Sequence, residues 1–392
     1  MQIKKAFVIG MFVGMVIMFG VYLGLSPIRA RMLWGGNLPP EAKILEIYSI
    51  LTNHSIVPFD RDSLLNGMYR GLLEGVGDPY TYYFNREALA VFMERTDGTY
   101  TGIGLGVTVD PEDNLITAVN VFAGSPAEEA GLLPGDKILE VDGVNVTDKR
   151  TEEVTALIKG PPDTQVRLRM LRGNDPFNII ITRRQINVPT VAHRMLDNNI
   201  GYLHISSFDR ITYQQFVEAY LELRNQGMQG MIIDLRNNPG GLLDTVVDIG
   251  NLMLPEGPIL HVENSQGERT SHMSEDNRRI DMPLVVLVNN NSASASEVLT
   301  GAVRDYGVGT IVGQQTFGKG VVQTLYLLSD GSAVKLTIAR YYSPKGISIH
   351  GEGITPDYVV EVDRETAIMS IRLPLEEDVQ LQKAIEIMLG KI

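Results

Sequence analysis

The most restrictive feature of the sequence is a series of short apolar runs that alternate with helix-like segments between Gly201 and Asp363. The runs YLHISSF, GMIIDLR and PLVVLVN have the length and composition of strands buried on both faces. Segments with helical spacing of apolar residues lie between them, at Tyr213–Gln226, and after them, at Ser294–Tyr306. Strands that alternate with helices form a sheet flanked by helices, so the sequence predicts an α/β core over residues 186–365.

The stretches on either side of this core have different patterns. Between Thr99 and Gln185 the runs ITAVNVF, DKILEVDG, QVRLRML and FNIIITRR are typical of short strands separated by turns, which predicts a mainly-β domain over 99–185. Apolar residues recur at helical spacing within 38–97, so this N-terminal region is expected to be helical. A last amphipathic stretch, Leu375–Leu389, predicts one helix within residues 366–392.

The N-terminus carries an uncharged run of 20 residues, Ala6–Leu25. A helix of this length rises 1.5 Å per residue and spans a hydrocarbon core of about 30 Å. Basic pairs flank the run, and residues 1–34 contain no acid. We therefore expect residues 1–34 to anchor the chain in a membrane. A cleaved signal peptide is the alternative, although Pro27 directly follows the triplet Gly24-Leu25-Ser26 and disfavours cleavage there.

Composition argues against several classes of function. The formal net charge is −13, whereas a nucleic-acid surface needs clustered positive charge, so no nucleic-acid partner is expected. The chain has no cysteine, which excludes disulfides, thiolate zinc sites and a cysteine nucleophile. None of the six histidines lies in a recognisable catalytic signature. A Ser-His-Asp triad stays open, because triads are recognised in space. No metal or cofactor is expected.

Alternating glycines form the first motif, Gly102-Ile103-Gly104-Leu105-Gly106, and they allow backbone N–H groups to converge on an anion. The run GSPAEEAGLLPGDKILEVDG follows further along the chain. Together these motifs resemble a PDZ domain of the type found in bacterial proteases. Such domains bind C-terminal peptides by adding a strand to a sheet edge and holding the terminal carboxylate on loop amides. The resemblance implies that Gly102, Ile103, Gly104, Leu105 and Gly106 bind the peptide.

Two further motifs follow strands of the core. The run DLRNNPGG ends at Gly241, and paired glycines after a strand can direct amides at a developing oxyanion, although such a run also serves as a plain turn. The run NNNSASASEV leads from a strand into a helix. Its Ser294 and Glu297 have the spacing of a capping box. A serine at such a junction is also where nucleophiles lie, because a helix N-terminus favours nearby negative charge.

Lys319, within FGKGVVQ, is the candidate base for such a serine, because burial lowers the pKa of a lysine towards neutrality. The stretch Gly313–Lys319 fits the first part of a phosphate-binding loop, but Gly320 stands where Ser or Thr must hold magnesium. Ser332 and Lys335 have Ser-x-x-Lys spacing, but they lie in an alternating strand, where positions three apart point to opposite faces. Both alternatives are therefore set aside.

The order of these motifs along the chain is more specific than any one of them. From about Leu64 to Asp357 they resemble the carboxy-terminal processing proteases, which are tail-specific serine peptidases with a Ser-Lys dyad. The resemblance implies a crotonase-like α/β core with an inserted PDZ domain. It also implies roles for six residues: Ser294 as nucleophile, Lys319 as general base, Gln323 as the group that orients the lysine, and the amides of Ala295 and of Gly240 or Gly241 as the oxyanion hole.

The predicted function is therefore a serine endopeptidase that acts on proteins with accessible C-terminal tails. The resemblance places its body outside the cytoplasm, and the terminal helices could pair two subunits in a homodimer. Two other functions compete with this one: a PDZ scaffold with a silent protease core, and a crotonase-like acyl-CoA enzyme. The intact Ser294, Lys319 and Gln323 argue against the scaffold, and the PDZ insertion together with the Ser-Lys pair argues against the acyl-CoA enzyme.

Overall fold

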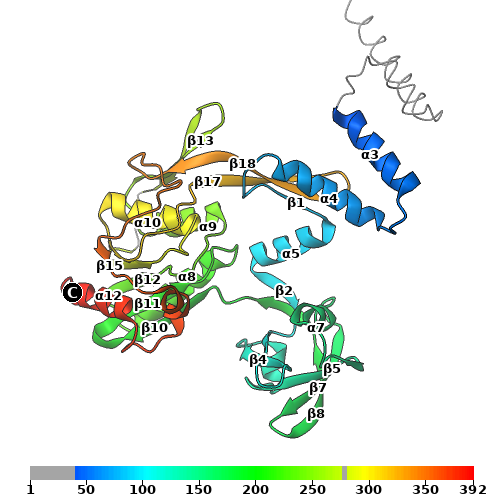
Figure 1. Ribbon diagram of the computed structural model, residues 1–392. Helices are drawn as coiled ribbons and strands as arrows, with labels where there is room; N and C mark the ends of the chain where they lie inside the picture. The colour runs from blue at the N-terminus through cyan, green and yellow to red at the C-terminus, as the bar shows by residue number, and fades with distance from the viewer. Residues whose placement is uncertain (1–39, 276–279) are drawn as a thin grey trace, which may run out of the picture. The chain divides into compact units, whose positions relative to one another are not determined.

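The computed structural model describes residues 40–275 and 280–392, which form two compact units divided after Tyr69 (Figure 1). The first unit contains helix α3 (Pro40–His54) and the start of α4 (Arg61–Glu74). Apolar side chains of both helices line a shallow groove: Ile44, Ile47, Leu51, Leu64, Leu65 and Met68.

The second unit is built on a six-stranded sheet in the order β10-β11-β12-β15-β16-β19. All neighbouring strands are parallel except β10, which is antiparallel to β11. The strands that the apolar runs predicted, β11, β12 and β15, lie next to one another and are buried throughout. The six strands are Val191–Leu196, Ile200–Ile205, Gly230–Asp234, Leu284–Val288, Thr310–Gly313 and Tyr358–Val359.

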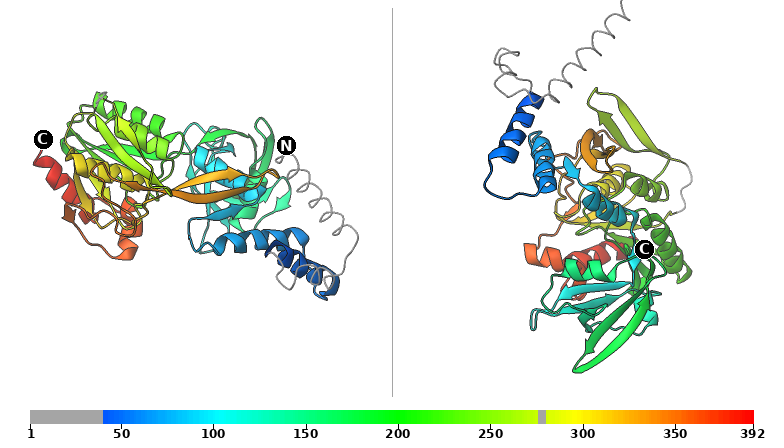
Figure 2. Two further views of the ribbon diagram at one scale, coloured as in Figure 1. Left: turned by 90° about the horizontal axis from the view of Figure 1, so that it is seen from above. Right: turned by 90° about the vertical axis from the view of Figure 1, so that its right-hand side faces the viewer.

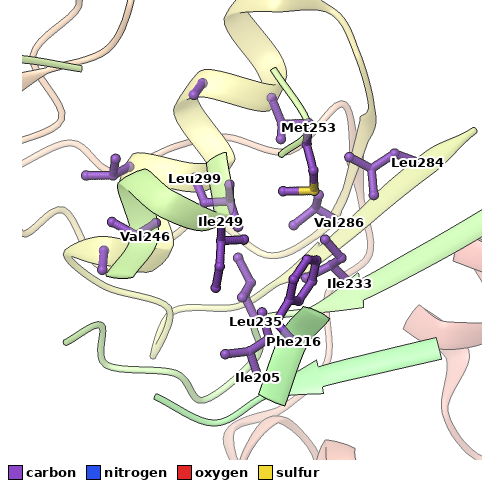
Figure 3. Close-up of a cluster of buried hydrophobic side chains, with 14 of the residues drawn as sticks. Ile205, Phe216, Ile233, Leu235, Val246, Ile249, Met253, Leu284, Val286 and Leu299 are labelled. Atoms are coloured by element: carbon purple, nitrogen blue, oxygen red, sulfur yellow. The ribbon is translucent and has the colours of Figure 1, made fainter. Parts of the chain in front are cut away.

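Helices cover both faces of this sheet, as the α/β prediction requires. Helices α8 (Thr212–Asn225), α9 (Leu243–Asn251) and α10 (Ala295–Tyr306) pack on one face, and α12 (Val379–Leu389) packs on the other. Successive residues of each strand point to opposite faces. Ile233 therefore joins the cluster with Phe216 and Leu299 in Figure 3, whereas its neighbour Ile232 packs with Leu381 of α12.

A second sheet carries the segment that follows Lys319. Its path is β1-β18-β13-β14, and β17 pairs with β18 as an antiparallel hairpin, visible in orange in Figures 1 and 2. The region expected to be helical, 38–97, contains α3, α4 and α5 (Arg86–Asp97), but the short strand β1 precedes α5 and pairs with β18 far along the chain. The five strands are Tyr82–Phe84, Ala333–Tyr342, Gly257–Asn264, Arg269–Ser274 and Val321–Leu327.

The region expected to be a PDZ domain forms its own sheet, in the order β3-β4-β5-β7-β8, with β6 paired to β5. Helices α6 (Pro126–Glu129) and α7 (Thr151–Ile158) complete its buried core. Strand β2 (Thr99–Gly102) pairs with β9 (Arg184–Asn187), so the chain enters and leaves this domain through one ribbon. The sheet strands are Leu105–Val109, Ile116–Val121, Lys137–Val141, Gln165–Arg172, Asp175–Thr182 and Val144–Asn145 for β6.

The C-terminal segment differs from the single helix expected within 366–392. Helix α11 (Arg364–Met369) and the 3₁₀ turn η2 (Ser370–Arg372) precede α12. Elsewhere in the chain, the 3₁₀ turn η1 (Asp197–Asn199) precedes β11. Helix α12 starts at Val379 rather than Leu375 because Asp378 caps it and accepts the Leu381 N–H at 3.0 Å.

The predicted membrane segment, Ala6–Leu25, lies outside the described residues. Within 40–275 and 280–392, no helix is both long enough and apolar enough to cross a membrane.

Candidate active site

Ser294 lies at the junction between strand β15 and helix α10, with φ 56° and ψ −114°. A positive φ is costly for a residue with a side chain, and it is typical of serine nucleophiles on strand-to-helix turns. The N–H of Glu297 donates to the carbonyl oxygen of Ser294 at 2.9 Å. The carbonyl, rather than the hydroxyl, therefore satisfies this end of the helix, and the Ser294 side chain lines a cleft.

Glu297 connects the serine to the lysine segment. Its side chain is fully buried, and its two carboxylate oxygens accept four hydrogen bonds. Oε2 accepts the backbone N–H groups of Ser294 at 2.9 Å and Lys319 at 2.8 Å. Oε1 accepts the Thr316 hydroxyl at 2.5 Å and the Gly318 N–H at 2.7 Å. Since hydrogen bonds to a charged acceptor are among the stronger ones, this carboxylate holds the two segments together.

Ser294 and Lys319 line the same cleft, which has a volume of about 520 Å³. The ring of Tyr80 lies 4.7 Å from Nζ of Lys319. The hydroxyl of Tyr341 donates to the carbonyl oxygens of Lys319 and of Ser294, the latter at 3.0 Å. No hydrogen bond joins the Ser294 hydroxyl to the Lys319 amine in the described chain. Such contacts are often long in free enzymes and tighten when substrate binds.

The surroundings of Lys319 favour its neutral form. Burial lowers the pKa of its amine below the usual range, and the positive charge of Lys335 lowers it further. Asp78 and Glu297 act in the opposite direction, but the net shift is downward. A lysine with a lowered pKa can accept a proton near neutral pH.

The backbone N–H groups of the three expected oxyanion residues differ in whether they already donate a hydrogen bond. The N–H of Gly240 donates to Oδ1 of Asn238 at 2.8 Å and is therefore occupied. The N–H groups of Gly241 and Ala295 have no hydrogen-bond partner among the described residues. Both residues line the cleft beside Ser294. The geometry thus favours Gly241 over Gly240 as the second amide.

Gln323 lines the cleft from strand β17. Its Nε2 donates to the Val321 carbonyl at 3.4 Å, and in the described residues it makes no hydrogen bond to Lys319. Its expected role in orienting the lysine stays a prediction. No histidine within 40–275 or 280–392 lines this cleft, so the site provides no imidazole base beside Ser294.

Two parts of the chain match known protein families. Residues 199–360 match the sequence profile of peptidase family S41, and residues 117–172 match that of a PDZ domain. The chain is 39% identical over 327 residues to the carboxyl-terminal-processing protease of Synechocystis sp.. This alignment covers 82% of the present chain and 76% of the relative. It is also 36% identical over 322 residues to the carboxy-terminal processing protease CtpA of Bacillus subtilis. That alignment covers 82% of the present chain and 69% of the relative. The chain belongs to peptidase family S41.

As an S41 peptidase, it is a serine-type protease that carries a PDZ domain. A putative S41 protease from Bacteroides fragilis has a solved structure that is 17% identical and aligns with a TM-score of 0.53. The alignment covers 86% of this chain and 92% of that one, and it shows a shared fold.

In the PDZ domain of this S41 protease, the expected peptide-binding residues run from the end of β2 through the two connecting residues, Ile103 and Gly104, into the start of β3. Gly104 has φ 81°, and a Cβ there would lie 2.2 Å from Cβ of Ser125. Ile103 is buried in the domain core, so only its backbone is available to a peptide. Gly102 packs under the ring of Tyr100, where a Cβ would lie 2.7 Å from Cε2. Burial raises the pKa of Tyr100 to about 12, although the N–H groups of Gly104 and Leu105 oppose this shift.

Sequence reasoning missed several residues of the S41 site. Asp78 and Tyr80 precede β1, and only their fold brings them to Lys319. The sequence pattern offers Lys335 only as a partner of Ser332, whose hydroxyl instead donates to Oδ1 of Asp330 at 2.6 Å. The rejection of that pair is consistent with the structure, but Lys335 itself lines the cleft. No local motif signals these positions, because each depends on the pairing of β18 with β1 or β17.

Proposed function

We propose that this S41 protease cleaves proteins that present accessible C-terminal tails, with Ser294 as the nucleophile and Lys319 as the general base. The observation that carries the assignment is the Glu297 carboxylate, which binds the backbone N–H groups of both residues and holds them at one cleft. The PDZ domain and the names of two relatives, both C-terminal processing proteases, support the choice of substrate.

The proposed reaction begins when Oγ of Ser294 attacks the carbonyl carbon of the scissile amide. An amide is a poor electrophile, so the hydroxyl must lose its proton during the attack, and the neutral Lys319 amine accepts it. When the intermediate collapses, the C–N bond breaks and Lys319 returns the proton to the leaving nitrogen. Water then attacks the acyl-enzyme, again with Lys319 as base, and releases the new C-terminus.

The developing oxyanion is assigned to the N–H groups of Ala295 and Gly241. Both lie beside Ser294 without partners among the described residues, so they can donate to substrate without breaking an existing bond. A single oxyanion donor is worth about 3 kcal/mol of transition-state stabilisation. Gly240 acts through conformation instead: its φ of 101° and its contact with Ser294 leave no space for a side chain.

Gln323 is assigned to orientation of the lysine. It lines the same cleft, and its uncharged side chain can accept a hydrogen bond from the amine. A carboxylate at this position would instead favour the charged amine and raise its pKa.

Substrate tails are assigned to the PDZ domain. The peptide would add as a strand beside β3, with its terminal carboxylate on the amides between Gly102 and Gly106. Binding there raises the effective concentration of the same chain at Ser294.

The uncharged run Ala6–Leu25 supports attachment to a membrane, with the catalytic body outside the cytoplasm. Full-length protein should stay with membranes after a carbonate wash. Mature protein that starts at Pro27 would instead identify the run as a cleaved signal peptide.

A homodimer through the N-terminal helices is supported by exposed apolar side chains on α3, namely Leu45, Ile47 and Ile50, which are at least half exposed. The C-terminal helix α12 instead packs on the sheet of its own chain. Large exposed apolar patches are typical of interaction sites. Sedimentation of the wild type and of Ile47→Lys should show a dimer and a monomer respectively.

Cleavage of an unfolded protein with a free C-terminus tests the catalytic assignment. Ser294→Ala and Lys319→Ala should each abolish cleavage while circular dichroism shows an intact fold. Lys319→Arg should also fail, because a guanidinium cannot act as a base at neutral pH. Gln323→Ala should be less severe.

A further inference from the structure

Lys335 occupies a defined position in the cleft that holds Ser294. It lies on β18, where it pairs with Leu325 of β17 and with Tyr82 of β1. Directly paired residues project from the same face of a sheet, as do residues two apart in one strand. Gln323, Leu325 and Lys335 therefore share one face of the hairpin, and all three line the cleft.

The walls around the Lys335 amine are mostly apolar. Its Nζ lies 5.8 Å from the ring centroid of Phe84 and 5.7 Å from that of Phe92. These rings belong to a small apolar cluster that also contains Leu325. Burial lowers the pKa of Lys335, and Asp78 opposes the shift through space.

Lys335 is half-buried but forms no ion pair with any carboxylate of the described chain. The acidic groups nearby are already engaged. Asp78 accepts hydrogen bonds from the N–H of Tyr80 at 3.1 Å and from the Thr81 hydroxyl at 2.6 Å. Asp209, which also lines the cleft, accepts the Ser207 hydroxyl at 2.9 Å.

A partly buried ammonium without a counter-charge is stabilised by any carboxylate that can reach it, and such a charge-assisted hydrogen bond is strong. Lys319 cannot be the cation that binds such a carboxylate, because its amine must be neutral to act as the base. We propose that Lys335 binds a carboxylate of the substrate peptide inside the cleft, and so makes acidic side chains or the chain terminus a determinant of cleavage. The proposal rests on the proposed function of the cleft.

Fluorogenic peptides that differ by one group test this proposal. A first series places Glu or Gln at successive positions around the scissile bond, with one common C-terminus. A second series keeps Gln throughout and ends in a free acid or an amide. Each ratio of kcat/KM, Glu to Gln or acid to amide, is measured on wild type, Lys335→Met and Lys335→Arg. The ratios cancel any general effect of the variants on Lys319.

We expect wild type to prefer the carboxylate at one position by about tenfold, which corresponds to roughly 1.4 kcal/mol. Lys335→Met should reduce that ratio to about one, and Lys335→Arg should retain most of it, since the charge remains. Lys345→Met, an exposed lysine outside the cleft, is the matched control and should keep the wild-type ratio. The series that responds to Lys335→Met identifies the source, either a side chain or the chain terminus.

Two results would overturn the inference but leave the proposed function intact. In the first, wild type cleaves the peptides but shows no preference for Glu over Gln or for the acid over the amide. In the second, Lys335→Met keeps the preference of wild type. A preference for the free acid that survives belongs to the PDZ domain rather than to Lys335. If wild type cleaves none of the peptides, or if Ser294→Ala cleaves them as well, the proposed function itself fails and the inference fails with it.

Discussion

The backbone N–H of Lys319 donates to Oε2 of Glu297 at 2.8 Å, and the same oxygen accepts the N–H of Ser294 at 2.9 Å. One buried carboxylate oxygen thus links the proposed nucleophile to the proposed base. The capping-box spacing of Ser294 and Glu297 predicted the contact with the Ser294 N–H. The contact with the Lys319 N–H joins residues that are 22 positions apart, so the relative position of the two catalytic groups depends on tertiary structure.

Glu297→Gln should lower kcat by about 100-fold, because a small displacement of catalytic groups has effects of this size. Each carboxylate oxygen of Glu297 accepts two hydrogen bonds, and the carboxamide replaces one of these oxygens with an NH₂ group, which cannot accept them. Two buried donors therefore lose their acceptor. Unsatisfied buried donors cost about 1–3 kcal/mol, so the free energy of unfolding in urea should fall by that amount. Glu112→Gln, on an exposed turn, is the control and should match wild type. A Glu297→Gln enzyme with wild-type kcat would show that this bridge does not position the site.

The pH dependence of cleavage should report the protonation of Lys319. The base must be neutral, so kcat/KM should rise as pH increases through its pKa, which burial and Lys335 place below the usual 10.5. Lys335→Met removes a positive charge and should therefore raise the pKa of Lys319 and move the rise in kcat/KM to higher pH. Lys335→Arg should leave the profile close to wild type. A shift to lower pH in Lys335→Met would contradict this electrostatic account.

Sequence patterns predicted the parts of this molecule that depend on local chemistry. The apolar runs identified β11, β12 and β15, because strands buried on both faces need continuous apolar residues. Turn and capping residues identified the junction at Ser294. The arrangement around Lys319 could not be predicted in this way, because Tyr80 reaches it only through the pairing of β1 with β18.

The choice between Gly240 and Gly241 was likewise beyond the sequence. Both follow the same turn, and paired glycines are compatible with either assignment. The structure separates them through Asn238, whose side-chain oxygen occupies the Gly240 N–H at 2.8 Å. A side-chain hydrogen bond of this kind depends on the final turn geometry and not on residue spacing.

Gly240→Ala should reduce kcat by at least 100-fold with a smaller effect on KM. The new Cβ would lie 2.7 Å from Cβ of Ser294 and 2.9 Å from the N of Ala295, so it displaces the proposed nucleophile and one oxyanion donor. Gly267→Ala is the matched control, since Gly267 has φ 80° but no atom near its Cβ position. The control carries the backbone strain without the collision. Equal losses in both variants would mean that strain, and not displacement of Ser294, causes the defect.

Amidation of the substrate C-terminus should slow cleavage about tenfold, because the PDZ amides lose a charged acceptor. Gly104→Ala should remove this discrimination, since its Cβ would collide with Ser125 and displace the loop. Gly124→Ala, which has a positive φ but an open Cβ position, should retain it. Binding of acid and amide peptides by fluorescence anisotropy separates recognition from catalysis. Equal affinity for both peptides would contradict carboxylate capture by residues 102–106.

Labelling with a serine-reactive fluorophosphonate, followed by peptide mapping, tests the Ser294–Lys319 assignment most directly. The account predicts that wild type is labelled at Ser294, that Lys319→Ala is labelled at least 100-fold more slowly, and that the wild-type rate increases with pH. Label on another residue, or labelling of Lys319→Ala at the wild-type rate, would contradict the assignment.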